Sequence, residues 1–268
     1  MISKIKLTAL EMLNTHQSTR YLLKLHKSFQ EDSGSNKVAY ITYYMFLSIL
    51  PLLLLSLTIF DIIFTNNSSL RERLVESTFS SIPVVGPTLE SNLSFVQSKG
   101  VTLFITVAIL IWASRAGALA LQDALNQIFK KDISKKSFLS KQLNAFVALV
   151  IISVGVVVPT FIQSIFESNF ALDLVFLLLN IFWNSMAILL LFWVLVGKKK
   201  AIGNGPLVGG IGLSLIQLIS VLFLRNSLDN QRPLYGTLAI VFVFIAWLSF
   251  QIRVLIYSAE INKLNLKG

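Results

Sequence analysis

Two charged side chains stand inside the last long apolar stretch of the chain. Arg253 and Glu260 are seven residues apart, which places them on one face of an α-helix, about 10 Å apart along its axis. An ionised group at membrane depth costs at least ~3 kcal/mol on insertion scales, so such residues are functional candidates by default. Arg253 is a candidate anion-binding group and Glu260 a candidate proton carrier. The alternative is that Arg253 reaches interfacial phosphates or clamps Glu260.

Polar side chains also recur in the first apolar stretch, AYITYYMFLSILPLLLLSLTIF at 39–60. On an ideal helix Tyr40, Tyr44, Ser48 and Pro51 share one face, and Asp61 returns to about the same arc. Pro51 removes one backbone hydrogen bond and should kink the helix, so a freed carbonyl needs a partner. This stripe either holds helices together or lines a polar cavity. In the second case Asp61 is a second candidate for a coupling proton.

The second apolar stretch ends in a basic and polar sequence, WASRAGALALQDALNQIF. Arg115 lies near its inner end, where it either snorkels to the headgroups or places a cation at the mouth of a cavity. Beyond it, the helix is expected to continue out of the membrane with Gln122, Asp123 and Asn126 exposed.

Amides recur in two later apolar stretches. Asn180 and Asn184 are one helical turn apart, and Gln217 shares a face with polar and small residues of the next stretch. Gly205 and Gly209 form a small-xxx-small pair that permits close helix approach. These amides are interpreted either as interhelical contacts or as further lining of the same cavity.

Long apolar segments must position these side chains. Of the 268 residues, 54% are hydrophobic and 13% are charged, whereas a soluble domain carries about a quarter charged residues. A membrane helix needs about 20 mostly apolar residues, and six segments qualify. The sequence therefore predicts an all-α, polytopic membrane protein with six transmembrane helices. The predicted spans are Val38–Phe64, Val101–Leu121, Leu143–Phe166, Ala171–Val196, Pro206–Leu224 and Leu234–Ala259.

Positive charge predicts the orientation of these helices. Sixteen of the 23 Lys and Arg residues fall in the N-terminal segment, the alternate connections and the tail, whereas five fall in the other connections. By the positive-inside rule both termini are cytoplasmic. The predicted organisation is a basic amphipathic N-terminal segment over 1–37, a transmembrane domain over 38–260 with a helical outer loop over 65–100, and a cytoplasmic tail over 261–268. The N-terminal helix lies either on the membrane surface or packed under the bundle.

Composition also argues against several function classes. The net charge of +10 lies in short blocks between apolar spans, unlike the basic face of a nucleic-acid binder. There is no cysteine, and the two histidines, His16 and His26, lack neighbouring carboxylate clusters. The sequence contains no HExxH or GxSxG. We therefore expect no enzyme, no cofactor, no metal site and no nucleic-acid partner; the expected partners are membrane lipids.

Three of these stretches, in this order, carry a family resemblance. AYITYYMFLSILPLLL at 39–54, IWASRAGALALQDALNQIF at 111–129 and YGTLAIVFVFIAWLSFQIRVLIYSAEIN at 235–262 resemble the YihY/virulence factor BrkB family. The resemblance implies a six-helix bacterial inner-membrane protein with both ends inside, and it singles out Tyr235, Gly236 and Glu260. Ser258 stands where a glycine is common, and Arg253 stands where the family is usually apolar.

The resemblance suggests functions without naming a substrate. Some members were labelled ribonuclease BN, which the absence of clustered His and carboxylate ligands does not support. Members are also linked to envelope integrity and to movement of lipids or other solutes. The expected function is a transporter or lipid flippase for an amphipathic or anionic substrate. The alternative is an envelope scaffold that transports nothing; the oligomeric state is left open.

Overall fold

The computed structural model describes residues 17–63, 101–130, 137–165, 170–228 and 236–266. Everything regular within these ranges is helical. Six helices are 24 to 30 residues long, and they correspond one for one to the six predicted apolar segments. Their bounds are Gly34–Ile63 (α3), Val101–Ile128 (α6), Phe138–Ile165 (α7), Phe170–Leu195 (α8), Gly205–Leu228 (α10) and Gly236–Asn265 (α11).

Several of these helices extend beyond the ends of the apolar segments from which they were predicted. α6 continues seven residues past Leu121, and α11 continues past Ala259 to Asn265. Apolar content alone cannot predict such ends, because a helix leaving the membrane keeps its backbone hydrogen bonds while its side chains become polar. α3 runs through Pro51 without interruption.

Three stretches of the described residues are long and apolar enough to cross a membrane: Phe138–Gly155, Leu174–Leu195 and Val241–Asn265. A further apolar stretch, Gly205–Ile219, is shorter. A helix of 24 residues rises about 36 Å, against a hydrocarbon core of about 30 Å. Large apolar side chains are exposed along these helices, including Leu178, Phe182, Phe242 and Phe250. Lipid is the solvent that such a surface requires.

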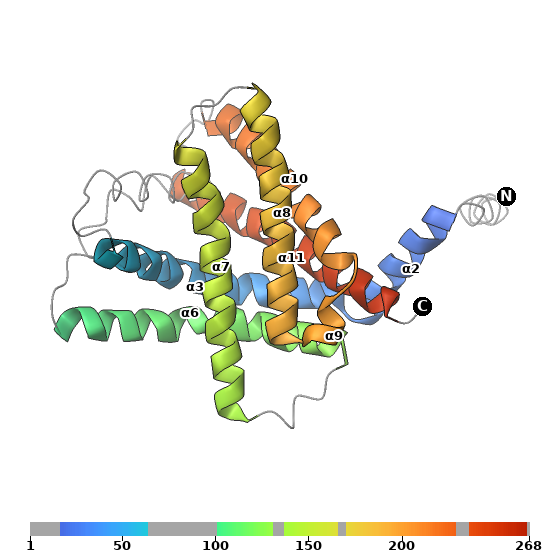
Figure 1. The fold of residues 1–268 in the computed structure, drawn as a ribbon, viewed down its shortest axis with the longest axis horizontal. Coiled ribbons are helices and arrows are strands. Elements are labelled where there is room, and N and C mark those ends of the chain that lie inside the picture. The colour runs from blue at the N-terminus through green and yellow to red at the C-terminus, as the bar shows by residue number, and fades with distance from the viewer. Residues whose placement is uncertain (1–16, 64–100, 131–136, 166–169, 229–235, 267–268) are drawn as a thin grey trace.

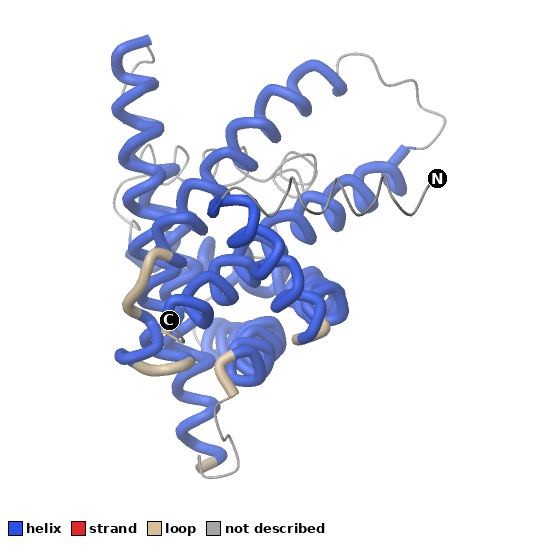
Figure 2. Tube along the Cα trace, turned by 90° about the vertical axis from the view of Figure 1, so that its right-hand side faces the viewer, coloured by secondary structure: helices blue, strands red, loops and turns tan. Residues whose placement is uncertain are grey.

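The helices pack in a continuous chain of contacts. α3 packs along α6, α6 contacts α7, α7 and α10 both contact α8, and α11 lies against α10 and α3. In Figure 1 α3 and α6 lie side by side while α7 and α8 cross them, and Figure 2 shows the same helices from the side. Two shorter helices complete the described part, Gln17–Glu31 (α2) and Lys198–Ala201 (α9).

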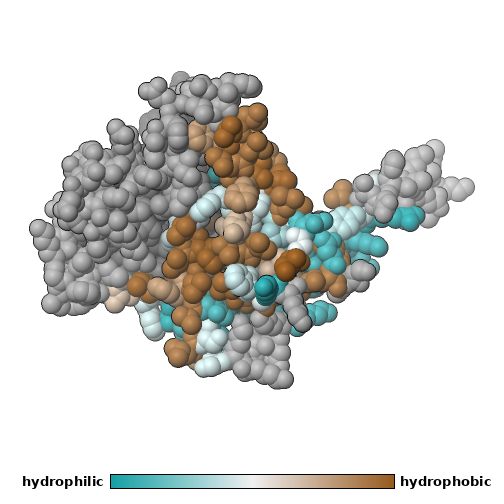
Figure 3. All heavy atoms as spheres, in the orientation of Figure 1, coloured by the Kyte–Doolittle hydropathy of each residue, from teal (hydrophilic) through white to brown (hydrophobic). Residues whose placement is uncertain are grey.

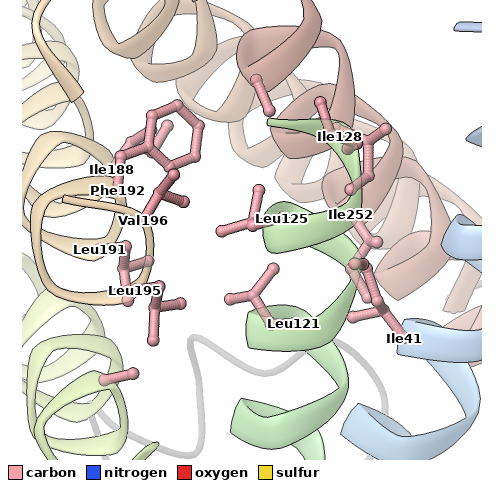
Figure 4. Close-up of a cluster of buried hydrophobic side chains, with 14 of the residues drawn as sticks. Ile41, Leu121, Leu125, Ile128, Ile188, Leu191, Phe192, Leu195, Val196 and Ile252 are labelled. Atoms are coloured by element: carbon pink, nitrogen blue, oxygen red, sulfur yellow. The ribbon is translucent and has the colours of Figure 1, made fainter. Parts of the chain in front are cut away.

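The buried core lies between α3, α6, α8 and α11. Leu121 and Leu125 of α6 extend toward Leu191 and Leu195 of α8, as Figure 4 shows, and all four are buried. Small residues such as Ala118 bring α6 close to its neighbours. Lipid tails are as apolar as these side chains, so dispersion contacts rather than escape from water stabilise this core.

The C-terminal part of α2 packs on the end of the bundle, whereas its N-terminal part is exposed and extends away from the other helices (Figure 1). Leu25, Ser28 and Phe29 are buried, and the Phe29 ring stacks on Tyr257 of α11 with centroids 4.3 Å apart. A left-handed residue, Ser33 (φ 53°), separates α2 from α3. Contact with the bundle is therefore present, while location of this helix at the membrane surface stays a prediction. In Figure 3 hydrophilic atoms gather near α2, and hydrophobic atoms cover much of the middle of the coloured surface.

Candidate functional site

Ser48 joins α3 to α6. Its Oγ accepts a hydrogen bond from the Gly117 N–H at 3.0 Å and lies 3.5 Å from the Ala113 carbonyl oxygen. Ser48 is 3% exposed, and a Cβ on Gly117 would lie 2.9 Å from Met45 Sδ. The hydroxyl therefore bonds the neighbouring helix at a point where the two backbones approach closely.

The tyrosines of the same predicted stripe lie differently. Tyr40 is 45% exposed and Tyr44 is half-buried, with their rings edge to face at 4.9 Å. Tyr40 therefore lies at the outer edge of α3 in the described part. Pro51 and Asp61 belong to α3, but the surroundings of their side chains lie outside the described residues.

Arg115 is held between α6 and α7. Its guanidinium carbon lies 3.2 Å from the centroid of the Trp112 ring, a cation–π contact, and its Nη1 donates to Gln142 Oε1 at 3.2 Å. The side chain is half-buried. The positive charge of Arg115 therefore interacts with the ring face of Trp112 and the amide oxygen of Gln142, both near the protein surface.

Two of the predicted cavity residues meet between α8 and α10. Asn184 Nδ2 donates to Ser214 Oγ at 3.0 Å and to Gln217 Oε1 at 3.3 Å. Asn184 and Ser214 are buried and Gln217 is half-buried. We call these three residues the amide cluster. Asn180, one turn earlier on α8, is half-buried.

Glycines allow α8, α10 and α11 to come this close. A Cβ on Gly210 would collide with Ser185 Oγ and lie 2.8 Å from Ser185 Cα; one on Gly209 would lie 2.8 Å from Ser258 Cβ. A Cβ on Gly205 would strike the Ser258 carbonyl oxygen. The close approach predicted from Gly205 and Gly209 is present.

Arg253 and Glu260 share a face of α11 but not an environment. Arg253 is exposed, whereas Glu260 is fully buried because α2 covers only the C-terminal part of α11. Ser28 Oγ donates to Glu260 Oε2 at 2.7 Å, and Lys263 Nζ lies 3.2 Å from the same oxygen. Lys263 also pairs with Asp32.

These contacts form a buried ionic cluster of Ser28, Asp32, Glu260 and Lys263. Lys263 Nζ additionally donates to Ser28 Oγ at 3.1 Å, and Lys37 donates to the Asp32 backbone oxygen. Glu260 Oε1 is buried without a hydrogen-bond partner among the described residues. Sequence reasoning singled out Glu260 but missed Lys263, three residues later on α11. It also missed Ser28 of α2 and Asp32 just after α2, because both lie more than 200 residues from α11 in the sequence.

A second group that sequence reasoning missed is centred on Asn262. Its Oδ1 accepts from the Gly205 N–H at 2.8 Å, and its Nδ2 donates to the carbonyl oxygens of Ala201 at 2.9 Å and Lys200 at 3.2 Å. Lys200 Nζ donates to the Phe129 carbonyl oxygen at 2.7 Å. Asn262 and Lys200 therefore join the ends of α6, α9, α10 and α11 at one end of the molecule.

The expected exposure of Gln122 and Asn126 is wrong. Gln122 is 1% exposed and Asn126 0%, while Asp123 is half-buried. The polar end of α6 faces the bundle because α6 packs against neighbouring helices, α8 and α11 among them. Both polar atoms of the Gln122 side chain and Asn126 Oδ1 lack a hydrogen-bond partner among the described residues. The sequence feature that could have indicated this burial is the i, i+4 spacing of Gln122 and Asn126, which places both amides on one face of the helix.

The remaining predicted positions lie at the margin of the described part. Tyr235 falls outside it, and Gly236 is the first residue of α11. Within the described ranges, no group of three or more His, Asp or Glu side chains is arranged to hold a metal ion.

Comparisons with known proteins agree with the resemblance carried by the three motifs. The family described as Virulence factor BrkB matches residues 25–266. The chain is also 21% identical to the Inner membrane protein YhjD of Escherichia coli (strain K12), over 94% of this chain and 82% of that protein. No solved structure matches. Since the family match spans nearly all the described helices, the chain belongs to the BrkB family of integral membrane proteins.

Proposed function

We propose that this protein is a bacterial inner-membrane transporter or lipid flippase for an amphipathic or anionic envelope substrate. In this proposal the chain crosses the membrane six times with both termini in the cytoplasm. It has no catalytic role, no cofactor and no nucleic-acid partner.

One observation carries the proposal: buried amides within the helical bundle. The amide cluster lies between α8 and α10, and Gln122 and Asn126 place further polar atoms in the interior. A buried polar group without a partner costs about 1–3 kcal/mol. Polar residues retained inside a membrane protein despite such a cost are typical of a pathway for substrate or water.

The distribution of charge and of helix ends supports the proposed topology. The ends of α6 and α11 and the start of α10 meet through Lys200 and Asn262, as expected of helices that alternate in direction. The lysine-rich connections gather at this same end in the sequence-based topology. The similarity to a protein named for the inner membrane supports the location.

The transport proposal is tested by reconstitution. The full chain is placed in liposomes, and movement of labelled anionic phospholipids is measured with and without a proton gradient. We expect movement above that of protein-free vesicles, and at least about tenfold slower movement with Asn184→Leu, because the amide cluster loses its shared donor. Ser153→Ala is the matched control, since among the described residues that hydroxyl donates to the Leu149 carbonyl of its own helix. No movement with labelled lipids or anionic solutes would overturn the proposal.

A specific observation favours a second candidate, the envelope scaffold. Ser48, Arg115 and Asn184 each have partners on a neighbouring helix, which is what helix-joining polar groups do. If the scaffold is correct, Asn184→Leu lowers thermal stability, and wild-type vesicles move no substrate.

A further inference from the structure

A groove opens at the end of the bundle where α2, α10 and α11 meet. It has a volume of about 760 Å³ and is lined by Tyr21 and Lys24 of α2, by Ile202, Gly203 and Asn204 before α10, and by residues 264–266 at the end of α11 and just beyond it. This volume falls within the range of ~300–1,000 Å³ that is usual for ligand sites. The groove is separate from the amide cluster, which lies between α8 and α10.

Hydrogen bonds and ion pairs with neighbouring residues hold the residues that line the groove. Asn262 binds the backbone of residues 200, 201 and 205, and a Cβ on Gly203 would collide with Asn262 Oδ1. On the other wall, the buried ionic cluster fixes α2 against α11 through Lys263. The residues around the groove are therefore joined to α2 and α11 by hydrogen bonds and ion pairs.

The polar lining is chemically suited to an anion. Lys24 contributes an ammonium, and Asn204, Asn265 and Tyr21 contribute amide and phenol donors. None of the described residues that line the groove is acidic. A phosphate group with a single negative charge complements this set, because ammonium and amide groups donate to its oxygens.

The apolar rim adds a second requirement. Ile202 is 64% exposed, Leu266 49% and Tyr21 38%. The apolar stretch Val241–Asn265 ends at the groove, so in the proposed topology we expect these side chains near the boundary between acyl chains and headgroups. A ligand that complements both the polar lining and the apolar rim has a phosphate headgroup and an apolar chain.

We propose that this groove binds the phosphate headgroup of an anionic phospholipid, with Lys24 as the principal charge contact. The apolar chains of the lipid lie against Ile202 and Leu266. This binding does not depend on transport, and it would be present in a scaffold as well.

Native mass spectrometry of the full chain in detergent tests the proposal. The protein is incubated with phosphatidylglycerol or phosphatidylcholine, and retained lipids are counted. We expect preferential retention of phosphatidylglycerol and about fivefold weaker retention with Lys24→Gln, the effect of one interfacial lysine. Lys27→Gln is the matched control: it removes the same charge from the same helix, at an exposed position that does not line the groove.

Each of the other possible outcomes contradicts one part of the proposal. Equal retention by the wild type and Lys24→Gln excludes the groove, and an equal loss with Lys27→Gln indicates diffuse attraction to the basic helix. Inorganic phosphate separates the two sources of the anion. If it raises the melting temperature as much as phosphatidylglycerol does, and Lys24→Gln abolishes that rise, the site binds free phosphate instead of lipid. Ile202→Ser, which should weaken only lipid retention, checks the apolar half.

Discussion

The buried ionic cluster concentrates charge where α2 meets α11. Lys263 is shared by Asp32 and Glu260, and their exposed side-chain fractions are 8%, 16% and 0%. Desolvation of three charges is costly, and it is offset only while each keeps its partner. The cluster therefore makes α2 docking depend on single side chains.

Lys263→Met should lower the free energy of unfolding by ~3 kcal/mol, because it leaves two buried carboxylates unpaired. Thermal denaturation in detergent measures the loss. Lys27→Met, which breaks an exposed pair with Glu31, should cost less than ~1 kcal/mol. A double variant, Glu260→Gln with Lys263→Met, should lose less than the sum of the single variants. Strict additivity would show that the two side chains do not interact.

Close helix packing is the main feature at the scale of elements. α8, α10 and α11 approach through glycines, and the amide cluster joins α8 to α10. In a membrane, such contacts replace the hydrophobic effect as the force between helices. A single added methyl group therefore has a different effect at different glycines.

Gly210→Ala should destabilise the protein by about 1–3 kcal/mol, since the new methyl group meets the backbone of Ser185. Gly155→Ala on α7 is the control: its Cβ would lie 3.7 Å from Ala187 Cβ, an ordinary contact. We expect this control to be neutral or stabilising by up to ~1 kcal/mol, because alanine favours the helix. Melting temperatures of the two variants give the comparison, and equal values would contradict the packing argument.

At the scale of the whole molecule, polar contacts join several helix ends at one end of the described part, whereas many large apolar side chains are exposed along its long helices. Asn262, Lys200 and the ionic cluster all lie at this end, and so does the groove. In the proposed topology this end faces the cytoplasm. The body of the protein exposes Phe182, Phe242 and other large apolar side chains to lipid.

The topology is testable by cysteine labelling, since the chain has no cysteine of its own. Lys198→Cys lies in the connection between α8 and α10, and Ser91→Cys lies in the predicted outer loop. In intact spheroplasts a membrane-impermeant maleimide should label only Ser91→Cys. Lys198→Cys should react after permeabilisation. The opposite pattern would place both termini outside.

The sequence by itself determined the long helices and their family, because apolar length follows directly from the thickness of a membrane. It also identified Asn184 and Gln217, since amides in an apolar helix must turn toward protein. Only the tertiary structure decided which polar groups meet. Helical periodicity assigns a face but not what covers that face, so Arg253 and Glu260 looked alike until α2 covered one of them. The ionic cluster, the Asn262 contacts and the lipid groove all require segments distant in sequence to pack together.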